Sequence, residues 1–143
     1  MRGILFELPG VAERAKAHVE AAGLADRCQM IGGSFFESVP DGADAYMLRH
    51  IIHDWDDEKS TKILENVHRA MGKDGKLLIA EYVIPPGNAP SVGRGVDLVM
   101  LVISGGQERT EEEYRQLYEA CGFWLTRIVP TKAGVGVIEG TIR

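Results

Sequence analysis

A chain of 143 residues with 45% hydrophobic and 26% charged residues has the composition of one globular domain. Its net charge of −5 is spread along the sequence, so no basic face is expected for nucleic acid or an anionic membrane surface. The two cysteines follow no metal-ligand spacing, and no segment resembles a signal peptide or a membrane span. We therefore expect a cytoplasmic protein that binds neither nucleic acid nor membranes.

The N-terminal part of the chain alternates short β-type runs with a helical pattern, which indicates an α/β fold. Residues 3–6 predict a strand, and an alanine-rich helix is expected over residues 11–22. Gly23 follows this helix and is a residue that commonly ends helices. A second short strand is predicted over residues 28–31.

The first half of an apolar run over residues 45–52 predicts a buried parallel strand, although Arg49 and His50 interrupt the run near its end. The acidic residues that follow suit the start of a helix, and either Asp56 or Asp57 is expected to cap it. Apolar residues recur along this helix at the spacing that forms one buried face.

Another buried strand is predicted over residues 77–83, after the helix ends at Gly72. A crossover of strand, helix and strand is right-handed in nearly all proteins and makes its two strands parallel. The carboxyl ends of the two strands therefore point the same way. We expect His53 and Glu81 to lie towards the same edge of the sheet.

The C-terminal part contains one ambiguous run and three clear elements. Residues 92–104 are compatible with a buried helix or a strand, and we favour the helix. Thr110 and Glu113 form a capping box that begins another helix. The β-rich runs 123–129 and 135–142 predict an antiparallel hairpin. The expected fold is a Rossmann-like, doubly wound, mostly parallel α/β sheet that ends in this hairpin.

Ligands of open α/β sheets bind outside the carboxyl ends of the strands, so the polar residues there are candidate site residues. The predicted strands place Glu7, Ser34, Arg49, His53 and Glu81 at this edge. A carboxylate such as Glu7 can accept hydrogen bonds from both hydroxyls of a ribose. The alternative is a solvated acid that precedes the first helix.

The sequence HIIHD at residues 50–54 allows a metal site or a catalytic base. A histidine followed by aspartate resembles the HD phosphohydrolases, but that family is helical and this motif follows a strand, so we expect no metal. His50 is interpreted as a core or boundary histidine whose polar groups are satisfied. His53 near Glu81 suits proton abstraction at neutral pH, while the alternative is a loop histidine packed on Trp55.

Several motifs together resemble the catalytic domain of S-adenosylmethionine-dependent O-methyltransferases, typified by plant caffeate and flavonoid enzymes and by bacterial polyketide-tailoring enzymes. The resemblance runs from about Arg2 to the end of the chain and corresponds to the C-terminal part of that domain. In chain order the motifs are GILFELP, IGGSFFESVP, RHIIHDWDDE, GKLLIAEYVIPPG and DLVMLVISGGQERTEEEY. We therefore expect residues 1–143 to be part of one catalytic domain.

The resemblance implies a role for several residues in methyl transfer. His53 would be the general base that deprotonates the acceptor hydroxyl, and Glu81 and Glu108 would flank and orient its imidazole. Asp54 and Met100 would touch the acceptor, although an apolar stripe such as the one containing Met100 is more often part of a core. Such a reaction needs two aligned reactants and the removal of one proton.

The resemblance also implies a site for S-adenosylmethionine and its product S-adenosylhomocysteine. Glu7 would bind the ribose hydroxyls, Leu8 would lie beside the adenine, Ser34 and Phe35 would lie at the adenine ring, and Arg49 would lie near the cofactor. The family usually has aspartate at the positions of Glu7 and Ser34 and often lysine at that of Arg49. The serine lacks the carboxylate that would accept from the adenine amino group.

The resemblance further implies that the family's first strand and its glycine-rich loop lie before residue 1. A sheet without its middle strand would leave unpaired backbone, so we expect a homo-oligomer. The expected function is transfer of a methyl group to a hydroxyl of a small aromatic or polyketide-like acceptor. Alternatives are a non-catalytic interaction module that has lost cofactor binding, and an enzyme of the same fold that performs hydroxylation or decarboxylation.

Overall fold

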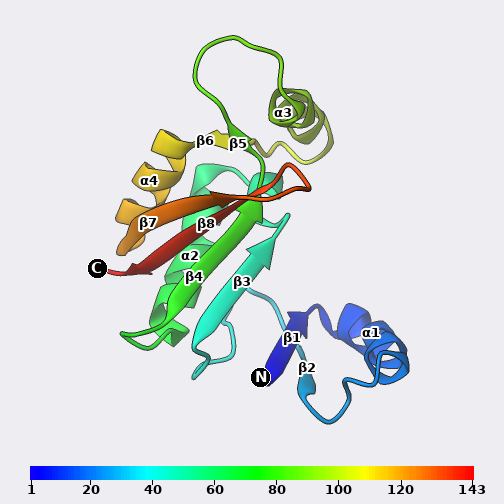
Figure 1. Cartoon of the computed structure of the whole chain (residues 1–143). Helices are drawn as coiled ribbons and strands as arrows, with labels where there is room; N and C mark the ends of the chain where they lie inside the picture. Colours follow the sequence, from blue (N-terminus) through cyan, green and yellow to red (C-terminus); the bar gives the residue numbers. More distant parts are fainter.

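The computed structural model describes residues 1–143. Its larger sheet has the strand order β3, β4, β8, β7 (Figure 1). β3 (Ala45–Arg49) and β4 (Lys76–Glu81) are parallel, whereas β8 (Gly136–Ile142) and β7 (Phe123–Pro130) complete the sheet as an antiparallel hairpin. The crossover and the hairpin predicted from the sequence are both present.

The N-terminal elements form a separate, smaller layer. β1 (Gly3–Glu7) and β2 (Cys28–Gly32) are a parallel pair, connected by α1 (Pro9–Ala21), which has proline in its first turn. No ladder of hydrogen bonds joins this pair to the larger sheet (Figure 1). Each of β1 and β3 therefore has a strand partner on one side only.

The hydrophobic core lies where two helices pack against the larger sheet and against each other. α2 (Asp57–Ala70) is capped by Asp56, whose carboxylate accepts from the backbone N–H of Lys59 at 2.9 Å. Of the two predicted caps the structure thus selects Asp56. α4 (Glu111–Ala120) begins at the predicted capping box. The core comprises Ile52, Ile63, Leu64, Val67, Met71, Leu77, Ile79, Tyr114, Leu117, Tyr118, Cys121, Phe123 and Ile138.

The strand predicted over residues 77–83 is divided into two elements. β4 ends at Glu81, where its antiparallel partner β8 begins, and the chain then turns away from the sheet. β5 (Val83–Ile84) pairs in parallel with β6 (Arg109–Thr110), which the sequence patterns did not predict. This small sheet brings the segment before α4 next to the carboxyl end of β4.

The run at residues 92–104 is a helix, α3 (Val92–Ile103), but it is not buried. Its exposed apolar residues are Val92, Leu98, Val99, Leu101, Val102 and Ile103, with exposed fractions of 46% to 84%. The expectation of a buried element is therefore wrong for this chain, because α3 packs on β5 and leaves most of its apolar surface uncovered. No helix combines the length and the apolar character needed to cross a membrane.

Candidate active site

The residues that precede His53 form a tight turn instead of the end of a strand. β3 stops at Arg49, His50 adopts a left-handed backbone with φ of 52°, and Ile52–Asp54 form a single 3-10 turn, η1. The strand predicted for the first half of the apolar run at residues 45–52 is therefore confirmed. The turn carries the His53 side chain into a nearly buried position, with an exposed fraction of 7%.

The Glu81 carboxylate holds this turn by accepting hydrogen bonds from the backbone of the turn. One carboxylate oxygen accepts from the N–H groups of Ile51 at 3.1 Å, Ile52 at 2.7 Å and His53 at 3.3 Å. The other oxygen accepts from the Tyr114 hydroxyl at 2.6 Å. Glu81 is fully buried, and this burial raises the pKa of its carboxyl group. Glu81 thus makes no hydrogen bond to the imidazole, but its charge lies close enough to raise the pKa of His53.

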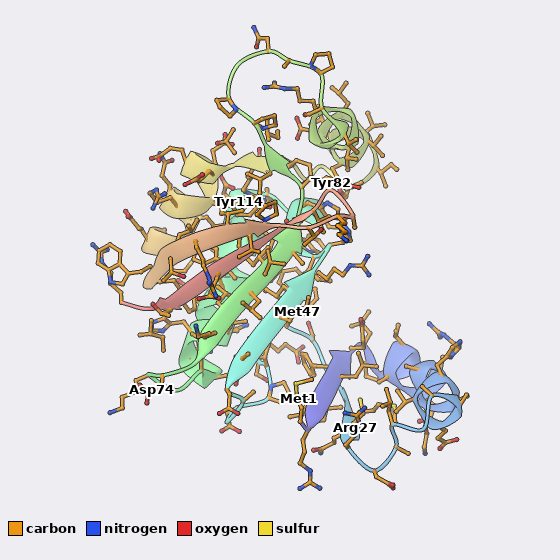
Figure 2. All side chains as sticks on the ribbon, in the orientation of Figure 1. Met1, Arg27, Met47, Asp74, Tyr82 and Tyr114 are labelled. Atoms are coloured by element: carbon orange, nitrogen blue, oxygen red, sulfur yellow. The ribbon has the colours of Figure 1, made fainter.

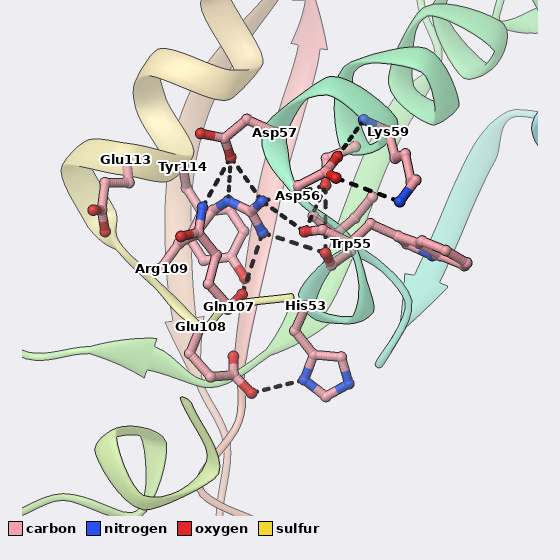
Figure 3. Close-up of polar contacts among 12 residues, drawn as sticks. His53, Trp55, Asp56, Asp57, Lys59, Gln107, Glu108, Arg109, Glu113 and Tyr114 are labelled. Carbon is pink, nitrogen blue, oxygen red and sulfur yellow. Dashed lines mark hydrogen bonds and ion pairs between the residues drawn. The ribbon is translucent and has the colours of Figure 1, made fainter. Parts of the chain in front are cut away.

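Glu108 is the carboxylate that contacts the imidazole directly (Figure 3). The Nδ1 atom of His53 lies 2.7 Å from a carboxylate oxygen of Glu108, whose side chain is fully buried. Because an ionised carboxylate can only accept, Nδ1 carries the proton and Nε2 is free to take another. The hydrogen bond to Glu108 raises the pKa of His53 above 6.5, against the opposing effect of burial.

The segment Gly105-Gly106-Gln107 brings Glu108 to this position. Gly105 has a φ of 73°, and a side chain on Gly106 would overlap the His53 carbonyl group. The same carbonyl accepts from the N–H of Gln107 at 2.9 Å, and the N–H of Glu108 donates to Asp97 of α3 at 2.9 Å. The two glycines are therefore needed for a close approach between two distant segments of the chain.

Arg109 is a functional candidate that sequence reasoning missed (Figure 3). Its guanidinium group is 1% exposed and donates to the carbonyl oxygens of Ile52 at 3.3 Å and Trp55 at 3.1 Å. It also forms an ion pair of 2.7 Å with Asp57 at the start of α2. The signal was its place directly after Glu108, since an arginine beside the carboxylate that contacts His53 can hold the same turn.

The residues expected to bind cofactor lie at two places. Glu7 ends β1, and its carbonyl accepts from the N–H of Gly33 at 2.9 Å, so Glu7 and Leu8 lie near Ser34 at the carboxyl end of the small sheet. Phe35 turns towards the larger part, where its carbonyl accepts from Asn66 of α2 at 2.7 Å. The Glu7 carboxylate has no hydrogen-bonding partner within the chain, whereas the Ser34 hydroxyl accepts from the N–H of Phe36 at 3.3 Å.

Arg49 stands apart from that group, because it ends β3 in the other sheet and its exposed side chain makes no ion pair. Asp54 has a carboxylate oxygen 3.7 Å from Nε2 of His53, too far for a hydrogen bond. Met100 is half-buried on α3 and lies one turn after Asp97, the residue that contacts Glu108. The structure thus brings Asp54 to the base and places Met100 on the helix face that borders it.

His50 differs from the satisfied core or boundary histidine that the sequence suggested. Its Nδ1 atom is buried without any hydrogen-bonding partner, and its ring centre lies 5.1 Å from that of His53. The two histidines and Asp54 do not form a metal-binding cluster, since no group of three or more suitable side chains converges anywhere in the chain.

Comparison with known proteins identifies the family. The profile of the O-methyltransferase domain matches residues 1–124 of the 143. The chain belongs to the O-methyltransferase domain family. This result confirms the resemblance based on the motifs.

Two curated O-methyltransferases illustrate how much of the family this chain represents. It is 49% identical over 138 residues to the phenazine O-methyltransferase of Lysobacter antibioticus and 44% identical over 140 residues to the mitomycin biosynthesis 6-O-methyltransferase of Streptomyces lavendulae. The alignments cover 96% and 97% of this chain but 40% of each relative. The chain spans about two fifths of the length of these enzymes.

Solved O-methyltransferase structures confirm the Rossmann-like fold. The mitomycin 7-O-methyltransferase superposes with a TM-score of 0.94 at 41% identity, covering 100% of this chain and 42% of that chain. An O-methyltransferase of neocarzinostatin biosynthesis, in complex with S-adenosylhomocysteine and 1,4-dihydroxy-2-naphthoic acid, superposes with a TM-score of 0.91 at 34% identity and the same coverage. A pericyclic reaction enzyme matches 99% of this chain and 36% of its own at a TM-score of 0.89 and 25% identity.

Replacing Glu108 with glutamine is expected to lower the pKa of His53. The carboxylate hydrogen bond is the largest cause of the raised pKa, and without it the opposing effect of burial is countered only by the charges of Glu81 and Asp54. NMR titration of the histidine ring signals measures this pKa. Glu119→Gln removes an equal charge from an exposed position on α4 and should leave the titration unchanged. An unaltered His53 titration in Glu108→Gln would contradict the coupling.

Replacing Gly106 with alanine should destabilise the chain by about 1–3 kcal/mol, because the added methyl group overlaps the His53 carbonyl. Urea denaturation measures the free energy of unfolding. Gly95→Ala is the matched control, since Gly95 lies within α3 with open space around its Cβ position. Alanine there should stabilise the helix by up to about 1 kcal/mol. Equal effects of the two substitutions would show that the approach at Gly106 is not tight.

Proposed function

We propose that residues 1–143 are part of the catalytic domain of an S-adenosylmethionine-dependent O-methyltransferase that acts on a hydroxyl of a small aromatic or polyketide-like acceptor. The observation that carries this proposal is the nearly buried pair of His53 and Glu108, with 2.7 Å between Nδ1 and the carboxylate. The pair leaves Nε2 of His53 as a proton acceptor at the carboxyl edge of the strands, where ligands of such sheets bind.

In this proposal His53 is the general base. Nε2 accepts the proton of the acceptor hydroxyl, and the imidazolium ion that forms is stabilised by Glu108 at Nδ1. The raised pKa of His53 makes it a stronger proton acceptor than a free histidine. Asp54, with its carboxylate 3.7 Å from Nε2, and Met100 on α3 are proposed to contact the acceptor.

The residues at the carboxyl ends of β1, β2 and β3 fit the expected cofactor. S-adenosylmethionine, when bound, supplies an electrophilic methyl group on a sulfonium ion. The Glu7 carboxylate has no partner in the chain and suits two ribose hydroxyls, while Leu8 and Ser34 lie near it and are proposed, with Phe35, to contact the adenine. Arg49, at the end of β3, is proposed to lie near the remainder of the cofactor.

A second candidate is another reaction on the same fold. The similarity to a pericyclic reaction enzyme favours it, because that protein shares the fold at a TM-score of 0.89. The non-catalytic module is a further alternative, and Ser34 in place of the usual aspartate favours it. Methyl transfer is preferred over both, since it gives His53 and Glu108 a direct use and agrees with O-methyltransferases 49% and 44% identical to this chain.

Substituting His53 with alanine is expected to lower methyl transfer by roughly 10²–10⁴, the contribution of a positioned base, without weakening S-adenosylhomocysteine binding. Transfer of a labelled methyl group measures the first quantity and calorimetric titration the second. His18→Ala is the control, because His18 is exposed on α1. Binding without methyl transfer by the unaltered protein would favour the other candidates, and absence of binding would contradict the proposal for this chain.

Self-association is also proposed. β1 and β3 each have one unpaired edge, and α3 exposes an apolar face, so the chain has backbone and side-chain surface that a second copy can cover. Light scattering at micromolar concentration should give the mass of a dimer or a larger assembly. A monodisperse species of 15.7 kDa would contradict this expectation.

A further inference from the structure

The backbone of His50 adopts a conformation that is unfavourable for a residue with a side chain. Its φ of 52° makes it the one residue other than glycine with a positive φ in this chain. A side chain in the left-handed region costs stability, and such residues persist where the surrounding structure or a function requires them. Six glycines occupy the other positive φ positions, so a glycine at residue 50 would meet the same backbone requirement without strain.

The imidazole of His50 also has an unmet hydrogen-bonding group. Nδ1 is buried and has no partner, although the ring as a whole keeps part of its surface exposed. Buried polar atoms nearly always have a partner, so an orphaned one calls for an explanation. The N–H of His50 donates to the Ala80 carbonyl at 3.3 Å and helps to hold this backbone, whereas no contact within the chain satisfies Nδ1.

The ring of His50 lies between the proposed base and the ring of Tyr82. The ring centres of His50 and His53 are 5.1 Å apart, and those of His50 and Tyr82 are 6.0 Å apart. Tyr82 follows the carboxyl end of β4 and lies close to the start of α3 (Figure 2). These three residues form a row of rings at the edge of the sheet where ligands bind.

Tyr82 differs from the other tyrosines in its hydroxyl group. The hydroxyl groups of Tyr46, Tyr114 and Tyr118 each donate a hydrogen bond within the chain. The Tyr82 hydroxyl has no partner within the chain, and it is not buried, so it is open to solvent. The row therefore offers two accessible polar groups that no hydrogen bond within the chain uses, Nε2 of His50 and the Tyr82 hydroxyl.

We propose that His50 and Tyr82 determine acceptor specificity by hydrogen-bonding a second oxygen of the acceptor while His53 faces the hydroxyl that is methylated. This assignment rests on the proposed function. Two imidazoles 5.1 Å apart can each place a nitrogen at hydrogen-bonding distance from oxygens on neighbouring carbons of one ring. The acceptor class is thus an aromatic hydroxy compound with a hydroxyl, carbonyl or carboxylate oxygen beside the reacting hydroxyl.

The first test measures the stability of His50→Gly. If His50 is retained for a ligand, glycine relieves the strained backbone and the melting temperature holds or rises by about 2–4 °C. If His50 serves the fold, the melting temperature falls, and the proposal is overturned. His18→Asn, on the exposed face of α1, is the control for replacing a histidine and should leave the melting temperature unchanged.

The second test measures the binding of two fluorescent probes to the chain in the presence of S-adenosylhomocysteine. 1-Hydroxy-2-naphthoic acid has a carboxylate beside its hydroxyl, and 1-naphthol lacks it. The unaltered chain should bind the acid about tenfold more tightly, as expected for one additional hydrogen bond. His50→Gly and Tyr82→Phe should each reduce this preference, and Tyr82→Phe does so without changing the charge of the site.

The outcomes separate this assignment from the proposed function. Equal binding of both probes, no binding of either, or a preference that survives both substitutions overturns the roles of His50 and Tyr82. The methyltransferase proposal is judged independently, by binding of S-adenosylhomocysteine alone and by the loss of methyl transfer in His53→Ala. Loss of the preference in both variants, with stability retained, supports the assignment.

Discussion

The Glu81 carboxylate is fully buried and accepts hydrogen bonds from three successive backbone amides and from the Tyr114 hydroxyl. A carboxyl group removed from water is costly unless hydrogen bonds replace its lost hydration. These four donors do so, and they fix the turn at residues 51–53 to the end of β4 and to α4. The position of His53 depends on this arrangement.

Arg109 holds the other side of the same turn. Glu81 accepts from amides of the turn, whereas Arg109 donates to the carbonyl oxygens of Ile52 and Trp55 and pairs with Asp57. The turn is therefore held at its N–H groups by Glu81 and at its carbonyl oxygens by Arg109, which limits the freedom of the His53 ring. Glu108 precedes Arg109 directly, so the pairing that places the arginine also places the carboxylate on the imidazole. One short segment thus provides both the support and the partner of the proposed base.

The remaining parts of the proposed site are more open. Glu7 ends a strand of the small β1–β2 sheet, which no strand ladder joins to the larger sheet, whereas Phe35, just after β2, packs against the core of the larger part. The apolar residues of α3 are exposed, although their pattern is typical of a covered helix. The chain spans 40% of the length of each of two related enzymes, so the structure shows these surfaces without the other parts that those enzymes contain.

The sequence by itself determined the order of elements, the α/β class and the family, because capping residues, apolar periodicity and contiguous motifs act over short distances. Thr110 and Glu113 make the capping box that their spacing predicts, and the hairpin pairs as expected. Only the tertiary structure decided that Glu81 bonds the main chain, that Arg109 is buried, and that His50 is strained and unsatisfied. These features depend on contacts between segments far apart in the chain or on a backbone angle. Such contacts and angles leave no periodic pattern in the sequence.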